Sequence, residues 1–151
     1  MLCPARAVMK CYLLALCSGS SLDQHSNNIT LFNLVEQLNF PPHAHPPAGT
    51  RLPLEIHAYF ELRPEEIDQR FDVRFALVES NGLETLTDPF QHKSTTPRYR
   101  TRTLGLPAPP GPGSYQLRID FRASGTEAWL RDATSWPLLV VRSEERPRVT
   151  H

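Results

Sequence analysis

The chain has 151 residues, which is the length of one ordinary domain and is enough to close a hydrophobic core. Its 16 basic and 16 acidic residues cancel to a formal net charge of zero. This balance excludes the long-range field with which many proteins attract nucleic acid or an anionic membrane, so any charged function must be local. The 15 prolines disfavour long helices, because a proline inside a helix removes a hydrogen bond and clashes with the preceding turn.

The first twenty residues allow two interpretations. Arg6 and Lys10 precede a short apolar run at residues 11–17, and small residues follow it, which is the order of a secretory signal. The run is short for such a signal and also suits a first β-strand over residues 8–17. The strand interpretation, which we favour, predicts a cytoplasmic protein. The alternative is export through a signal in residues 1–20. No stretch reaches the ~20 apolar residues of a membrane span.

Three segments alternate apolar and polar residues with the period of two that is typical of a half-buried strand. The longest is residues 52–62, and the others are residues 71–77 and residues 115–122. In each segment one face is apolar and the other carries polar or charged side chains. These segments therefore predict strands that pack one face on a core and expose the other.

Six further segments have less regular patterns. One of them, residues 29–38, is apolar on both faces and also suits three turns of helix, but we favour a strand. Turn signals separate the segments at a spacing that suits a sandwich or barrel. The sequence therefore predicts an all-β protein: a single antiparallel β-sandwich of about 8–9 strands, immunoglobulin-like or C2-like, over residues 1–142, with a polar, flexible tail over residues 143–151. The six segments are residues 8–17, 29–38, 84–87, 98–106, 127–131 and 136–142.

The cysteines and histidines do not form a recognised metal or disulfide motif. Cys3, Cys11 and Cys17 include no C-x-x-C pair. On one strand Cys11 and Cys17 would share a face about 20 Å apart, which is too far for a disulfide. We expect them to be free core residues in a reducing compartment. His43 and His45 could offer two ligands, but no partner motif follows. The sequence therefore predicts no metal and no cofactor.

Three segments carry a resemblance to a known family. Residues 21–33 read SLDQHSNNITLFN, residues 96–100 read TPRYR, and residues 112–119 read PGSYQLRI. Together they resemble an uncharacterised bacterial family of small β-sandwich proteins. The resemblance implies a cytoplasmic sandwich that retains its first strand, and it implies no activity. The tyrosine of the last segment is also typical of immunoglobulin-like sandwiches, where such a side chain hydrogen bonds back across a turn.

The loop at residues 23–28 contains the side-chain types of a hydrolase site, with Asp23, His25 and Ser26 followed by Asn28. A catalytic triad requires convergence in space and an oxyanion hole, and neighbours on one loop usually diverge. Aspartate, serine and asparagine are also common turn formers that cap free backbone amides. We favour the turn and keep a ligand-binding or hydrolytic loop site, using Asp23, His25 and Asn28, as the alternative.

A stripe of arginines is the most distinctive surface feature. At a period of two, Arg98, Arg100 and Arg102 fall on one face of a predicted strand, and Tyr99 and Thr101 fall on the other. Such a stripe could hold phosphates or an acidic partner, because guanidinium groups bind both in bidentate geometry. The competing interpretation is that the stripe pairs with glutamates on other strands without functional consequence.

Other charged residues are predicted to be structural. His57, Glu55 and Glu61 occupy the polar face of residues 52–62, which we expect to be solvated. Asp72 and Asp120 alternate with arginines on other strands, which favours cross-strand ion pairs over a calcium site.

The sequence contains no nucleophile elbow, phosphate loop or zinc-protease motif, which lowers the expectation of an enzyme. Our leading hypothesis is therefore a non-enzymatic β-sandwich that acts through protein–protein contact, as an assembly subunit or an adaptor. The contact would be with another protein or with a second copy of the chain, and no nucleic acid is expected.

Overall fold

The computed structural model describes residues 9–47, 49–142 and 149, and these residues form an all-β structure, as predicted. They contain ten strands, one short 3-10 helix and no α-helix; none of them lies in a helix that could cross a bilayer. The predicted tail at residues 143–151 lies outside the described residues except for Val149. The elements are β1 (Lys10–Asp23), β2 (Asn28–Leu34), β3 (Gln37–Phe40), β4 (Arg51–Glu61), η1 (Pro64–Glu66), β5 (Arg70–Glu79), β6 (Glu84–Leu86), β7 (Phe90–Lys93), β8 (Arg98–Pro107), β9 (Gly113–Ala123) and β10 (Leu130–Arg142).

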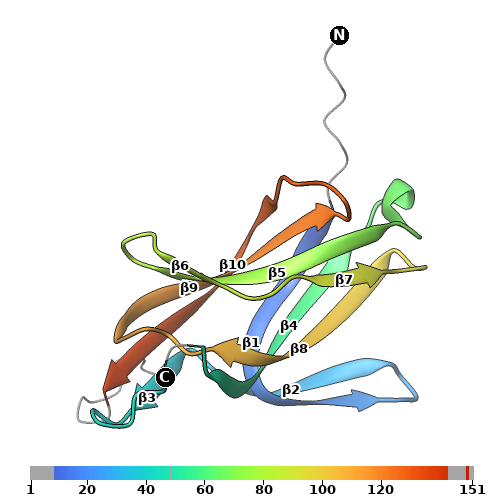
Figure 1. Ribbon diagram of the computed structural model, residues 1–151. Coiled ribbons are helices and arrows are strands. Elements are labelled where there is room, and N and C mark those ends of the chain that lie inside the picture. The colour runs from blue at the N-terminus through green and yellow to red at the C-terminus, as the bar shows by residue number, and fades with distance from the viewer. Residues whose placement is uncertain (1–8, 48, 143–148, 150–151) are drawn as a thin grey trace.

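The strands form two sheets, whose strands cross one another in the view of Figure 1. The first sheet has the order β2-β1-β4-β8. The second has the order β3-β10-β9-β5-β6, and β7 also pairs with β5. One hydrophobic core lies between the sheets, because buried residues from both belong to the same cluster.

The three regularly alternating segments form β4, β5 and β9, as predicted, and their apolar faces supply most of the core. In β9, Tyr115 is buried and its hydroxyl donates a hydrogen bond to the carbonyl of Gly111, which fixes the preceding turn. The most completely buried side chains of these strands include Ile56, Phe60, Val73, Phe75, Leu77, Leu117 and Ile119.

The predicted number of strands was wrong for a physical reason at residues 29–38. This segment is two strands in different sheets, since the chain leaves β2 after Leu34 and joins the second sheet at β3. At the crossing, the amide of Val35 donates to Leu16 of the first sheet, and the carbonyl of Glu36 accepts from Leu139 of the second. Of the segment's apolar residues, Val35 and Leu38 pack against the core, whereas Phe32 and Leu34 are exposed. The strand at Phe90–Lys93 was also missed, and residues 127–131 and 136–142 contribute to one strand, β10.

The prediction of a purely antiparallel structure was also wrong. β3 runs parallel to β10, and Leu139 pairs with Gln37 at the start of that ladder. All other strand pairs are antiparallel. A parallel pair needs a long connection, which the chain supplies because β3 and β10 are far apart in the sequence.

Strand β1 contains a bulge that changes which face its residues occupy. Cys11 pairs with Phe60 and Leu13 pairs with Tyr59, so the extra residue Tyr12 shifts the register. Cys11 therefore belongs to the core between the sheets, whereas Cys17 pairs with Glu55 and is buried on the opposite face. Both thiols are free, as predicted, but the expectation that they share a face was wrong.

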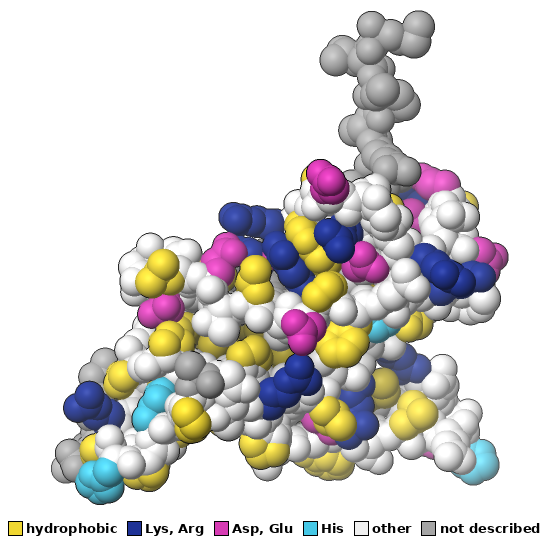
Figure 2. Space-filling view, viewed as in Figure 1, with side chains coloured by type: hydrophobic (Ala, Val, Ile, Leu, Met, Phe, Trp, Pro, Cys, Tyr) yellow, Lys and Arg dark blue, Asp and Glu magenta, His cyan; other side chains and the backbone are white. Residues whose placement is uncertain are grey.

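The outer face of the second sheet carries the predicted ion pairs. Arg74 binds Asp120 with 3.0 Å between Nε and Oδ2, and Arg122 binds Asp72 at the same N–O distance. The guanidinium carbons of both arginines lie 4.2–4.3 Å from the centre of the Trp129 ring. Figure 2 shows basic and acidic side chains interspersed on the visible face, consistent with the neutral net charge.

The half-buried His92 predicts a pH dependence of stability. Its ring lies against Phe71 and its Nδ1 is 3.1 Å from the hydroxyl of Tyr99. Burial lowers the pKa of His92 below its ordinary 6.5. The unfolded chain therefore takes up a proton at this site before the folded one does, so the contribution of His92 to stability is present above pH 6.5 and is lost as pH falls toward the lowered pKa.

The measurement is the free energy of unfolding in urea between about pH 8 and about pH 5. The variant His92→Gln is expected to lose less stability over this interval than the parent chain. As a control, His25→Gln alters an exposed histidine and should retain the parent's pH dependence. Equal slopes for the parent and His92→Gln would contradict the assignment.

Candidate functional site

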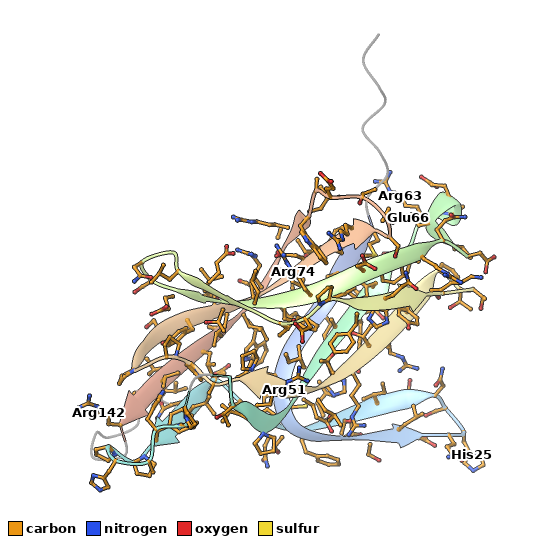
Figure 3. All side chains as sticks on the ribbon, in the orientation of Figure 1. His25, Arg51, Arg63, Glu66, Arg74 and Arg142 are labelled. Atoms are coloured by element: carbon orange, nitrogen blue, oxygen red, sulfur yellow. The ribbon has the colours of Figure 1, made fainter. Side chains whose placement is uncertain are left out.

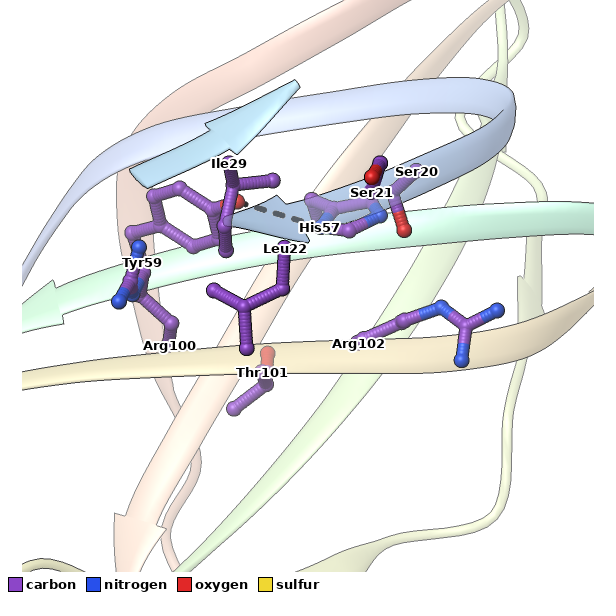
Figure 4. A pocket seen from close by; sticks show the side chains of 9 residues that line it. All are labelled: Ser20, Ser21, Leu22, Ile29, His57, Tyr59, Arg100, Thr101 and Arg102. Atoms are coloured by element: carbon purple, nitrogen blue, oxygen red, sulfur yellow. Dashed lines mark hydrogen bonds between the residues drawn. The ribbon is translucent and has the colours of Figure 1, made fainter. Parts of the chain in front are cut away.

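The hairpin of β1 and β2 creates a groove on the outer face of the first sheet, which is the face turned away from the core. The pairing of β1 with β4 ends at Cys17, opposite Glu55, and beyond Gly19 the strand pairs only with β2. Residues of this hairpin and of β4 and β8 enclose a groove of about 370 Å³. Figure 4 shows side chains of the hairpin beside those of β4 and β8. The groove is lined by Ser20, Ser21, Leu22, Ile29, His57, Tyr59, Arg100, Thr101 and Arg102.

A chain of hydrogen-bonded side chains lies beside the groove. Arg102 donates to Oε1 of Glu55 at 2.5 Å, and Oε2 of Glu55 is 2.8 Å from Nε2 of His57. The other ring nitrogen of His57 is 3.3 Å from the hydroxyl of Tyr59 (Figure 4). Glu55 is 5% exposed and His57 is 1% exposed. These polar groups are therefore fixed by one another rather than by solvent.

The expectation that this face of β4 is solvated was wrong for Glu55 and His57, and right only for Glu61, which is exposed. Register explains the burial. Alternate residues of β4 lie between outward-facing residues of β1 and β8, and the β1–β2 hairpin lies over part of them. The alternation of apolar and polar residues along β4 cannot predict that a distant hairpin lies over its polar face.

The electrostatics of the cluster follow from these contacts. The hydrogen bond from Arg102 is the main cause that lowers the pKa of Glu55 to about 2, and His57 and Ser20 act in the same direction. Burial raises the pKa of the Cys17 thiol. At neutral pH, Glu55 is therefore a carboxylate and Cys17 carries its proton.

The structure places the arginine stripe on this same outer face. Arg98 pairs with Glu61 across the ladder, Arg100 with Tyr59, and Arg102 with His57. Arg102 is neutralised by Glu55, as the structural interpretation of the stripe expects. Arg100 instead donates to the carbonyl of Asn27, and its guanidinium carbon lies 5.9 Å from the centre of the Tyr59 ring. The guanidinium of Arg98 lies near the ring of Tyr12.

The loop at residues 23–28 has the geometry of a turn. One carboxylate oxygen of Asp23 accepts from the amide of His25, the other accepts from the hydroxyl of Ser26, and that hydroxyl accepts from the amide of Asn28. All residues of the loop are exposed, and Figure 3 shows His25 at the outer end of the hairpin, away from the sheets. Nothing in this geometry favours the ligand-binding or hydrolytic alternative.

The two sequence-predicted sites are nevertheless neighbours. The bond from Arg100 to the carbonyl of Asn27, 2.8 Å long, joins the stripe to the loop. Sequence reasoning identified the arginines but missed Glu55, His57 and Tyr59 as their buried support. The sequence does show that these three residues alternate along β4. They can be recognised as support for the arginines only once β4 is known to pair with β8.

No protein-family model matches the chain, and a search of curated proteins found no relative. The class is therefore defined by the structure itself: a two-sheet all-β protein with an arginine-bearing groove on the outer face of one sheet.

Proposed function

We propose that the chain is a non-catalytic protein-binding domain that contacts an acidic partner segment through the arginine face of β8. The observation that carries the proposal is the position of β8. It is a strand of ten residues at the edge of the first sheet, and among the described residues it pairs only with β4. Its second edge is a template on which an extended segment can add as a further strand.

The charges beside this edge indicate the chemistry of the partner. Arg102 has a carboxylate partner, whereas Arg98 and Arg100 form no ion pair with any described residue. Two unpaired guanidiniums on alternate residues match carboxylates on alternate residues of an added strand. An acidic extended segment therefore satisfies both the backbone edge and the arginines.

The proposal includes the type of fold, an immunoglobulin-like β-sandwich, and a cytoplasmic location. The two sheets around one core support a β-sandwich, and the hydrogen bond from buried Tyr115 to Gly111 supports an immunoglobulin-like type over a C2-like one. The use of Lys10–Asp23 as a strand supports the cytoplasmic location and the retained first strand that the resemblance to the bacterial family implies.

The proposal predicts selective binding of an acidic extended peptide. The probe is a fluorescently labelled peptide of alternating glutamate and valine, followed by fluorescence anisotropy. A lysine–valine peptide of equal length is the control. Binding of the acidic peptide is expected to weaken as salt is raised. Reversing both unpaired charges, with Arg98→Glu and Arg100→Glu, should weaken it about 30-fold, because two exposed ion pairs contribute about 1 kcal/mol each.

The matched control is the double variant Arg131→Glu and Arg142→Glu. It changes the net charge by the same amount at two exposed sites on β10, in the second sheet, and it should bind like the parent chain. The interpretation that the arginines merely protect a free sheet edge predicts no binding of either peptide. That result, or equal weakening in both double variants, would contradict the proposal.

A further inference from the structure

Three side chains of different chemistry converge beside the groove, on β1 and β4. The Sγ of Cys17, one carboxylate oxygen of Glu55 and one ring nitrogen of His57 all lie within 4.8 Å of one another. Oε2 of Glu55 is 4.0 Å from Sγ and 2.8 Å from Nε2 of His57. All three residues are at most 5% exposed. Thiolate, imidazole and carboxylate are the three side-chain ligands of zinc.

The remaining atoms of two of these side chains are held by other residues. Oε1 of Glu55 accepts from Arg102, and Nδ1 of His57 lies 3.3 Å from the hydroxyl of Tyr59. Metal ligands are typically oriented in this way, with a hydrogen-bonding partner on the atom that does not bind the metal. Oε2 of Glu55 thus lies between Sγ of Cys17 and Nε2 of His57, while Oε1 and Nδ1 have other partners.

We propose that Cys17, Glu55 and His57 form a binding site for a divalent transition metal, with zinc as the preferred ion. A mixed sulfur, nitrogen and oxygen set favours zinc over magnesium or calcium, which prefer oxygen ligands alone. His57 also lines the groove, so a water molecule or a donor from a bound partner could complete a tetrahedron from that side. The three ligands lie on β1 and β4, and the arginine face contributes only Arg102, which holds Glu55.

Charge and protons are accounted for at such a site. Cys17 binds as a thiolate and releases its proton to solvent, and neutral His57 carries its proton on Nδ1, which donates a hydrogen bond to the hydroxyl oxygen of Tyr59. The thiolate and the Glu55 carboxylate offset the two charges of the dication, and the Arg102 guanidinium, which also binds Glu55, remains as one positive charge beside the site. The side chain of Arg102 is 53% exposed, so solvent screens its repulsion of the metal.

We expect the chain to fold without the metal. Among the described residues, no buried side-chain nitrogen or oxygen lacks a hydrogen-bond partner. The metal-free protein can therefore be prepared with a chelator and titrated in its folded state. Metal binding should then raise the temperature of unfolding, because the ion binds the folded chain in preference to the unfolded one.

The test is titration of the chelator-treated full chain with Zn²⁺ by calorimetry and with Co²⁺ by absorption spectroscopy. We expect one ion per chain, and the Co²⁺ form should show sulfur-to-cobalt charge transfer and the intense visible bands of a tetrahedral site. Cys17→Ala should abolish the charge transfer and weaken Zn²⁺ binding more than about 100-fold, whereas Tyr59→Phe should weaken it about 10-fold to 100-fold.

Cys11→Ala is the matched control, since Cys11 is also a buried free thiol on β1 but lies on the core side of the bulge. It should keep the stoichiometry and the spectrum of the parent, and Cys3→Ala should do the same. Circular dichroism establishes that each variant is folded before titration. Absence of a one-to-one complex in the parent, or a thiolate spectrum that persists in folded Cys17→Ala, would overturn the site. A failure of the acidic peptide to bind would contradict the proposed function but would not contradict the metal site.

Discussion

A chain that lacks residues 1–20 is expected not to fold. Strand β1 lies between β2 and β4 in the first sheet, so its removal breaks two ladders at once. It also removes Leu14 and Leu16 from the core, where they are 5% and 0% exposed. The expected loss equals the whole stability of an ordinary domain, about 5–15 kcal/mol. Circular dichroism and thermal unfolding should show no cooperative transition.

A chain that begins at Met9 is the control for this truncation. It keeps all of β1 and should unfold cooperatively. Cleavage of a secretory signal near residue 20 would remove the same strand, so the experiment also bears on the export alternative. A soluble chain without residues 1–20 that unfolds cooperatively would contradict both the role of β1 and the cytoplasmic proposal.

The variant Asp120→Asn is expected to cost about 3 kcal/mol of folding free energy. The Asp120 side chain is 1% exposed and accepts two hydrogen bonds from Arg118 and one from Arg74. Asparagine keeps the shape but removes the charge and turns an amide group toward guanidinium donors. Arg74 then loses its only carboxylate partner among the described residues and Arg118 keeps only Glu84, and a largely buried arginine without its counterion costs more than the net contribution of the original pair. Urea unfolding measures the difference.

Glu84→Gln is the matched control, because Glu84 binds the same Arg118 at 2.7 Å but is 27% exposed. An exposed ion pair contributes at most about 1 kcal/mol, so this variant should lose much less stability than Asp120→Asn. Equal losses in the two variants would show that burial of the carboxylate does not determine its contribution.

The fold was predictable wherever one face of a strand is buried and the other face is exposed to solvent. Strands β4, β5 and β9 were recognised from their period of two because each packs a single apolar face on the core. The ion pairs of Asp72 and Asp120 were predictable for the same reason. Alternation places charges on one face, and neighbouring strands bring opposite charges together.

The features that escaped prediction depend on contacts between distant segments. The bulge at Tyr12 moved Cys17 to the outer face, and the crossing at Val35 divided one apolar segment between two sheets. The groove exists because the β1–β2 hairpin lies over β4 and β8. The metal-binding cluster likewise joins Cys17 to Glu55 across a ladder, at a separation that no short motif describes.

Amide hydrogen exchange of the full chain, with and without the acidic peptide, tests most directly whether β8 is the binding edge. Saturating peptide should slow exchange at amides of Arg98–Pro107 that do not bond to β4, because an added strand supplies their partners. The other sheet edges, at β2, β3, β6 and β7, should exchange unchanged. Protection at any of these other edges, or bound peptide with no protection of β8, would contradict the proposed binding mode.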